Sequence, residues 1–167
     1  MKKLITIIAL AFITVAASAQ KVGHVNAQEL MLALPDYKAA SDELERFAGD
    51  KKKELDMYFS AFQTSQKEFE AALPTLTEEI KQQRYEELME KQQNIQAKQG
   101  QFEQEVAVKE QKLVEPIMTK VRNAISKVAK ENGYTYVFDE SSLLYFSDAE
   151  SLDAKVKTAL GIVVTAE

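Results

Sequence analysis

Side chains that could do chemistry are few in this 167-residue chain, and they are widely separated. There is one histidine, His24, and no cysteine, so a disulfide, a thiolate metal site and a cysteine nucleophile are excluded. His24 lies in the apolar alternation Val22-Gly23-His24-Val25, and no second histidine exists to complete a metal site with it. We therefore expect a structural role for His24, and we predict no metal site and no cofactor.

Paired carboxylates are the remaining candidates for acid–base chemistry. Glu78 and Glu79 are neighbours on a predicted helix, so their side chains point in different directions. Asp139 and Glu140 follow a predicted strand, but no catalytic partner accompanies them. The five glycines are too far apart for a phosphate-binding loop. The chain is therefore predicted not to be an enzyme.

A different kind of site is indicated by four large apolar side chains on otherwise polar helices, namely Met57, Tyr58, Phe59 and Met89. Methionine and aromatic residues on a charged surface suit apolar partners of varied shape. These four residues are candidate binding residues. The alternative is that they flank a helix–helix contact and only widen it.

The first 19 residues are predicted to be a cleaved export signal. Lys2-Lys3 is followed by an apolar stretch too short to span a membrane and by the cleavage pattern Ala17-Ser18-Ala19. The chain after residue 19 carries 19 basic and 26 acidic residues. This acidic balance argues against nucleic-acid binding, because phosphate contacts require a positive field.

The elements that must position these residues are mostly helical. Residues 22–25 are predicted to be a short strand, with a helical turn through Leu30. Two long helices are predicted over residues 36–73 and 77–132, separated at Pro74, with Thr75 or Thr77 as the cap of the second. Asn132-Gly133 predicts a helix stop, residues 134–138 and 143–146 two strands, and residues 151–160 a closing helix.

The apolar residues of the two long helices are mirror images about the turn at residues 73–77. Positions whose numbers add up to about 150 are apolar on both helices at coiled-coil spacing, which predicts an antiparallel hairpin. The predicted seam consists of Leu44, Leu55, Phe62, Phe69, Ile80, Leu88, Ile95, Phe102 and Val106.

Two mid-helix glycines, Gly49 and Gly100, fall at one level of this mirror. Glycine costs about 1 kcal/mol relative to alanine in a helix interior, so this level is a predicted hinge. The alternatives are close packing of the two backbones, or a chance coincidence of the two glycines.

Short strands at the base of the hairpin make a small sheet whose edges need covering. Several chains that combine their strands would cover them, so we expect an oligomer. The candidate interface residues are Val22, Val25, Tyr136, Phe138, Leu144 and Phe146. The predicted fold class is α+β, mostly α, with a long antiparallel hairpin (residues 36–115) that projects from a small β-rich oligomerisation body (residues 20–35 and 116–167).

Several stretches resemble the OmpH/Skp family of periplasmic chaperones over nearly the whole chain after the signal. They are "KVGHVNAQELMLALPDYKAA", "LTEEIKQQRYEEL", "LVEPIMTKVRNAISKVAKENGYTYVFD" and "LDAKVKTALGI". The resemblance implies a homotrimer in the periplasm of a Gram-negative bacterium, in which three hairpin tentacles enclose unfolded outer-membrane proteins without ATP. It also implies that Pro116 marks the entry of the second helix into the trimer body.

One departure from the family concerns charge. The best-studied members are basic, whereas residues 36–115 carry 12 basic and 18 acidic side chains. We therefore expect little electrostatic binding to an anionic membrane surface, and client selection through apolar contacts or basic client segments. A structural coiled-coil protein that tethers fixed envelope partners is the alternative function.

Overall fold

The computed structural model describes residues 20–162, so the predicted export signal at residues 1–19 lies outside the described residues. The chain divides into two compact units, which meet at Leu30/Met31 and at Lys120/Val121. The first unit contains both ends of the described chain, and the second unit is Met31–Lys120. Within the described residues, no helix combines the length and apolar character needed to cross a membrane.

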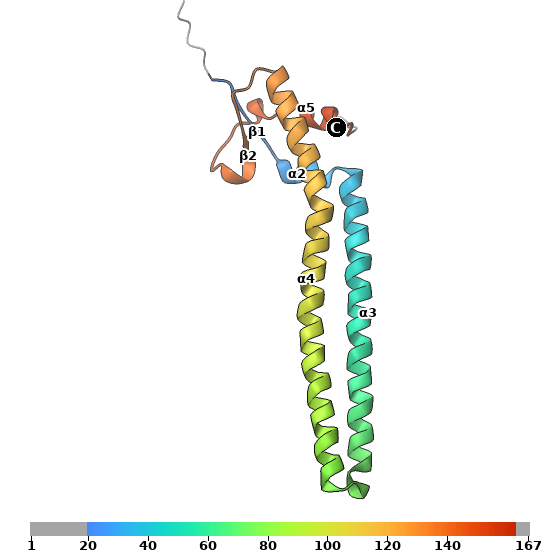
Figure 1. Cartoon of the computed structure of the whole chain (residues 1–167). Coiled ribbons are helices and arrows are strands. Elements are labelled where there is room, and N and C mark those ends of the chain that lie inside the picture. The colour runs from blue at the N-terminus through green and yellow to red at the C-terminus, as the bar shows by residue number, and fades with distance from the viewer. Residues whose placement is uncertain (1–19, 163–167) are drawn as a thin grey trace, which may run out of the picture. The chain divides into compact units, whose positions relative to one another are not determined.

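The second unit is an antiparallel helical hairpin (Figure 1). Helix α3 spans Pro35–Ala72 and helix α4 spans Glu78–Glu131, which confirms both predicted helices to within one residue at every end. Residues 121–131 of α4 belong to the first unit. Pro35 begins α3, where its missing N–H has no helical partner to lose. Pro116 lies inside α4, which continues through it. The 54 residues of α4 correspond to a length of roughly 80 Å.

A single 3₁₀ turn, η1 (Leu73–Thr75), joins the two helices at the tip. The hydroxyl of Thr75 donates a hydrogen bond back to the main-chain oxygen of Ala72 at 2.9 Å. The prediction that Thr75 caps the second helix is therefore wrong, because its side chain closes the preceding turn. Helix α4 begins directly after Thr77, with Glu78 and Glu79 in the first turn, where the helix dipole favours negative charge.

The first unit contains a two-stranded parallel sheet. Strand β1 (Val22–Val25) pairs with β2 (Tyr136–Asp139), with Val22 opposite Tyr136 and Val25 opposite Asp139. Strand β1 lies where it was predicted, whereas β2 starts two residues later than expected. The strand predicted over residues 143–146 is absent. Residues 143–146 are irregular, and just before them Asp139 accepts a hydrogen bond from the amide of Ser141 at the start of a 3₁₀ helix, η2 (Glu140–Ser142).

Short helices complete the first unit: α2 (Ala27–Leu32), whose first residues belong to it, η3 (Asp148–Glu150) and α5 (Asp153–Ala159). Helix α5 confirms the predicted closing helix in a shorter form. Gly133, with a φ of 71°, follows the end of α4 as the predicted helix stop. The apolar core of this unit is small and consists of Val25, Leu30, Val121, Ala124, Val128, Leu152 and Val156.

Gly23 is essential to this core because other side chains occupy the place of its missing one. A Cβ atom at Gly23 would lie 2.3 Å from Leu152 Cδ1 and 2.7 Å from Tyr134 Cε1. Leu152 is fully buried, so it has no room to move away. Glycine in the middle of β1 therefore lets Leu152, just before α5, and Tyr134, just after α4, pack directly on the strand.

We predict that Gly23→Ala lowers the free energy of unfolding of the first unit by about 1–3 kcal/mol, as expected for overpacking. Chemical denaturation followed by the fluorescence of tyrosine measures this change. The control is Gly49→Ala, where a Cβ meets nothing within 4 Å and the backbone is helical, so that stability should not fall. A Gly23→Ala protein as stable as the parent would contradict the packing described here.

Candidate functional site

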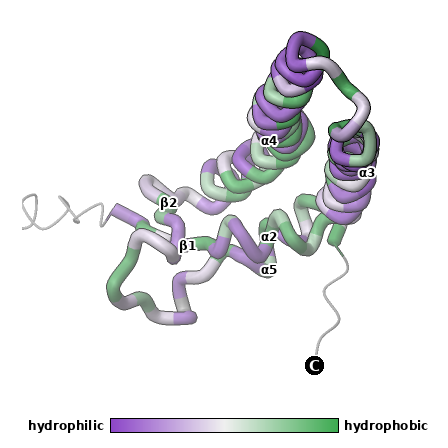
Figure 2. The backbone as a smooth tube through the Cα atoms, turned by 90° about the horizontal axis from the view of Figure 1, so that it is seen from below, coloured by the Kyte–Doolittle hydropathy of each residue, from purple (hydrophilic) through white to green (hydrophobic). Residues whose placement is uncertain are grey.

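The contact between α3 and α4 is a thin apolar seam. Among the nine predicted seam residues, Ile95 and Phe102 are buried, at 8% and 5% exposure. Leu44, Leu55, Phe62, Phe69, Leu88 and Val106 are half-buried, and Ile80 near the tip is exposed. Hydrophilic residues alternate with hydrophobic ones along both helices (Figure 2).

Polar contacts lie between these apolar layers and connect the two helices. Lys91 Nζ donates to Ser65 Oγ at 2.6 Å, and Lys51 Nζ is 2.7 Å from Glu105 Oε2. Lys109 also pairs with Glu43. In each pair, the two residues lie within two helical turns of positions whose numbers add up to 150, as the predicted hairpin requires. Polar residues in a coiled-coil seam set its register at a cost in stability.

Lys51 is the most connected of these polar residues. Its ammonium group lies 4.6 Å from the ring centroid of Phe102 and 5.6 Å from that of Phe47. The hydrogen bond from Lys51 lowers the pKa of Glu105, and the bond to Glu105 raises the pKa of Lys51. Lys51 therefore joins the two helices through one ion pair, with Glu105, and one cation–π contact, with Phe102, whereas Phe47 lies on the same helix as Lys51.

The glycine pair lies at this level of the hairpin. Ala48 and Gln99, which precede Gly49 and Gly100 in the chain, line one shallow hollow between the helices. A Cβ at either glycine would meet nothing within 4 Å, so close packing of the two backbones does not explain these residues. Packing is thus removed as an explanation, and the hinge stays a prediction, with chance coincidence of the two glycines as its alternative.

The predicted binding residues on the hairpin are all exposed, but to different degrees. Met57 is 72% exposed, and Phe59 and Met89 are also open to solvent. Tyr58 is the least exposed and continues the seam spacing from Leu55 to Phe62, so it flanks the helix contact. The ring of Phe59 lies 6.5 Å from that of Phe62. Sequence reasoning missed Tyr85, an exposed aromatic residue that lies off the seam in a charged stretch.

The first unit exposes a second set of apolar side chains. Of the six candidate interface residues, five are exposed: Val22, Tyr136, Phe138, Leu144 and Phe146. Val25 is 3% exposed, so its side chain is packed within its own chain and is not available to a partner. Tyr145, which is 85% exposed, belongs with this set and was missed because residues 143–146 were expected to form a strand.

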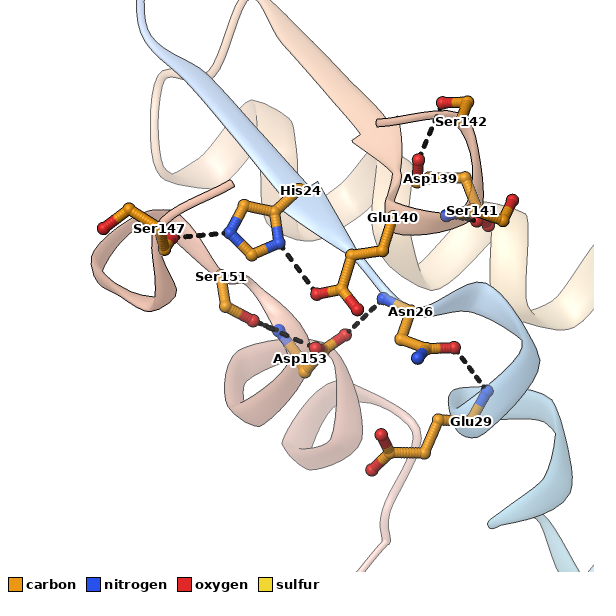
Figure 3. Close-up of polar contacts among 10 residues, drawn as sticks. All are labelled: His24, Asn26, Glu29, Asp139, Glu140, Ser141, Ser142, Ser147, Ser151 and Asp153. Carbon is orange, nitrogen blue, oxygen red and sulfur yellow. Dashed lines mark hydrogen bonds and ion pairs between the residues drawn. The ribbon is translucent and has the colours of Figure 1, made fainter. Parts of the chain in front are cut away.

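His24 is the buried polar residue of β1, at 3% exposure. Its Nδ1 lies 2.8 Å from Glu140 Oε1, and its Nε2 lies 2.8 Å from the main-chain oxygen of Ser147 (Figure 3). The ring also packs against Phe146, with centroids 4.6 Å apart. Since both partners are on the segment after β2, His24 connects that segment to the first strand.

The surroundings of His24 favour its protonated form. Burial alone lowers its pKa. The hydrogen bond to the Ser147 oxygen, the hydrogen bond to and charge of Glu140, and the charge of Asp153 together outweigh burial and raise the pKa of His24 above 6.5. Across residues 20–162, no group of three potential ligands from His, Cys, Asp and Glu is arranged to bind a metal ion.

The comparisons with known proteins agree with this architecture. A model of the family described as "Outer membrane protein (OmpH-like)" matches residues 21–160, and the chain therefore belongs to the OmpH family. This confirms the resemblance stated from the sequence.

Two relatives are chaperones by name. The chaperone protein Skp of Photorhabdus luminescens is 28% identical over 149 residues, which are 89% of this chain and 90% of the relative. The chaperone protein Skp of Vibrio cholerae serotype O1 is 24% identical over 145 residues, 87% of this chain and 86% of the relative. The crystal structure of an OmpH-like protein from Caulobacter crescentus CB15 has the same fold. It is 19% identical, with a TM-score of 0.74 over 87% of this chain and 86% of that one.

Replacing both Gly49 and Gly100 by alanine is predicted to stabilise the hairpin by about 1 kcal/mol per residue, because the new methyl groups meet open space. Amide hydrogen exchange around the two positions should slow. The hinge further predicts a narrower distribution of particle sizes by small-angle scattering. The exposed helical pair Gln63→Ala and Gln92→Ala is the control. An unchanged distribution of particle sizes in the glycine variant would contradict the predicted hinge.

Proposed function

We propose that this chain is an ATP-independent periplasmic chaperone that binds unfolded outer-membrane protein precursors and prevents their aggregation. It would act as a holdase and not as an enzyme. Membership of the OmpH family and the similarity to two Skp chaperones support this proposal. The proposed location also rests on the export signal expected at residues 1–19.

The observation that carries the proposal is the exposure of Met57, Phe59, Tyr85 and Met89 on helices that are otherwise charged. Met57 and Phe59 lie close together on α3, and Tyr85 and Met89 are one turn apart on α4. Each contact would contribute a small free energy, so many weak contacts would retain an unfolded chain and still release it. Methionine adapts to side chains of varied shape, which suits a binder of unfolded sequences.

The charge of the hairpin shapes the proposed client preference. With 18 acidic and 12 basic residues over residues 36–115, the hairpin attracts basic client segments and repels anionic surfaces. Binding to anionic lipid is therefore not part of the proposed function.

Assembly into a homotrimer is proposed through the first unit. Its sheet has only two strands, and parallel sheets are normally covered on both faces. Tyr136 and Phe138 of β2 are exposed with their rings 6.4 Å apart. Apolar surface from neighbouring chains would cover these residues and produce a cavity between the hairpins that receives the client.

We predict that the triple variant Met57→Gln, Phe59→Gln, Met89→Gln weakens client binding by roughly fivefold per residue, from about 1 kcal/mol per half-buried contact. The assay is light scattering during dilution of a urea-unfolded outer-membrane β-barrel protein. Helix content and molar mass should not change.

The matched control is a triple variant of exposed polar residues on the same helices, Gln63→Ser, Gln82→Ser and Gln92→Ser, which should protect like the parent. A protein that tethers fixed envelope partners would not protect the unfolded barrel at all. Equal protection by the two triple variants would place client binding on other residues.

A second prediction separates assembly from folding. Phe138→Asp should leave the single chain folded and dissociate the oligomer, because Phe138 is exposed in the chain. Val25→Asp should instead unfold the first unit, since it buries a charge in the core of the chain itself. Molar mass by light scattering and circular dichroism distinguish the two effects. A Phe138→Asp protein that keeps the parent's mass would contradict the proposed interface.

A further inference from the structure

The segment between β2 and α5 has little regular structure and depends on β1 for its position. It carries Leu144 and Tyr145, the most exposed large apolar side chains of the described chain. Its connections to the strand converge on His24. The ring contacts Glu140 at the start of the segment and Ser147 further along, and the main chain of His24 forms a bridge with Ser151 at the end.

The two ring contacts require two donors. The main-chain oxygen of Ser147 only accepts hydrogen bonds, and so does an ionised Glu140 carboxylate. A neutral imidazole has one N–H, so it can satisfy one of these acceptors and presents a lone pair to the other. The imidazolium ion has two N–H groups and satisfies both. With an ionised Glu140, the two 2.8 Å contacts in Figure 3 are those that a protonated histidine satisfies.

The charged groups on the elements around His24 are Lys21 before β1, Glu29 on α2, Asp139 in β2, Glu140 in η2, Asp148 and Glu150 in η3, and Asp153, Lys155 and Lys157 on α5. Of the basic groups, Lys157 pairs with Glu29 at 2.5 Å, and Lys155 donates to Asn132 at 2.9 Å. Glu140 and Asp153 act on the imidazolium and favour its charge. The electrostatic surroundings thus agree with the hydrogen-bond geometry.

We propose that His24 is a proton-dependent clasp, which fastens residues 140–147 to β1 when it is protonated and releases them when it loses its proton. Release frees Leu144 and Tyr145 from a fixed position. The clasp is reversible and acts within one chain.

The direction of the pH dependence follows from linkage. The pKa of His24 is raised in the folded chain. The contribution of its proton to stability is therefore fully present when the pH is below about 6.5, the pKa of histidine in the unfolded chain. That contribution is lost as the pH rises through the folded-state value. The segment should therefore be tighter in mildly acidic solution and looser in alkaline solution.

The composition of the chain makes this inference directly testable. His24 is the single histidine, so its imidazole proton resonances in the full chain are assigned without labelling, and their titration reports its protonation. The chain has no cysteine, so Tyr145→Cys accepts one nitroxide label at an exposed position. We expect the label to become more mobile as the pH rises, with the same midpoint as the histidine resonances.

Two variants and a control sharpen the test. Glu140→Gln keeps an acceptor but removes the charge, so both midpoints should move together to lower pH. His24→Gln should leave the label mobile at every pH. Asp148→Asn is an equivalent acid-to-amide change in an exposed residue of η3, and it should leave the midpoints in place. A label whose mobility does not change through the histidine titration, or changes equally in the His24→Gln protein, would overturn the clasp.

One consequence rests on the proposed function, because Leu144 and Phe146 are also candidate assembly residues. Below the midpoint, the fixed segment should favour the trimer, and above it the trimer should dissociate at a higher protein concentration. A chain that never forms a trimer would refute the proposed assembly. The mobility of the nitroxide label would then still test the clasp within the single chain. A trimer equally tight at both pH values would refute the link between clasp and assembly.

Discussion

The hairpin depends on a seam in which apolar and polar layers alternate. Ile95 and Phe102 are buried one heptad apart, and between such layers the two helices are joined by polar pairs such as Lys51 with Glu105. A fully apolar seam would be more stable but would specify its register less well. A thin seam also leaves most of each helix in solvent, so that large apolar side chains off the seam, such as Met57, are exposed. The proposed binding surface is a direct consequence of that arrangement.

The first unit differs from the hairpin because its small core is closely packed. Gly23 brings Leu152 and Tyr134 directly onto the backbone of β1, and His24 beside it forms two hydrogen bonds with the segment after β2. Aromatic residues of β2 and of that segment remain exposed. The buried residues of this unit are thus packed against other residues of the same chain. Its exposed apolar side chains would be buried in the proposed trimer.

Much of this architecture was predictable because it is periodic. The limits of α3, α4 and β1 follow from heptad spacing, alternation and the positions of Pro35, Pro74 and Gly133, which act locally. The third predicted strand is absent because, in the described chain, residues 143–146 pair with no other strand, and pairing across the chain leaves no local signal. Val25 was misjudged because alternation marks the apolar side of a strand but does not say whether its own chain covers it. The contacts of His24 span more than 110 residues and have no local signal.

The most direct test of the proposed chaperone is the molar mass of residues 20–167 by light scattering, alone and after mixing with a urea-diluted outer-membrane porin. The proposal predicts a trimer and, with the porin, a discrete soluble complex that contains one trimer per client. A monomer or dimer in whose presence the porin precipitates would contradict it.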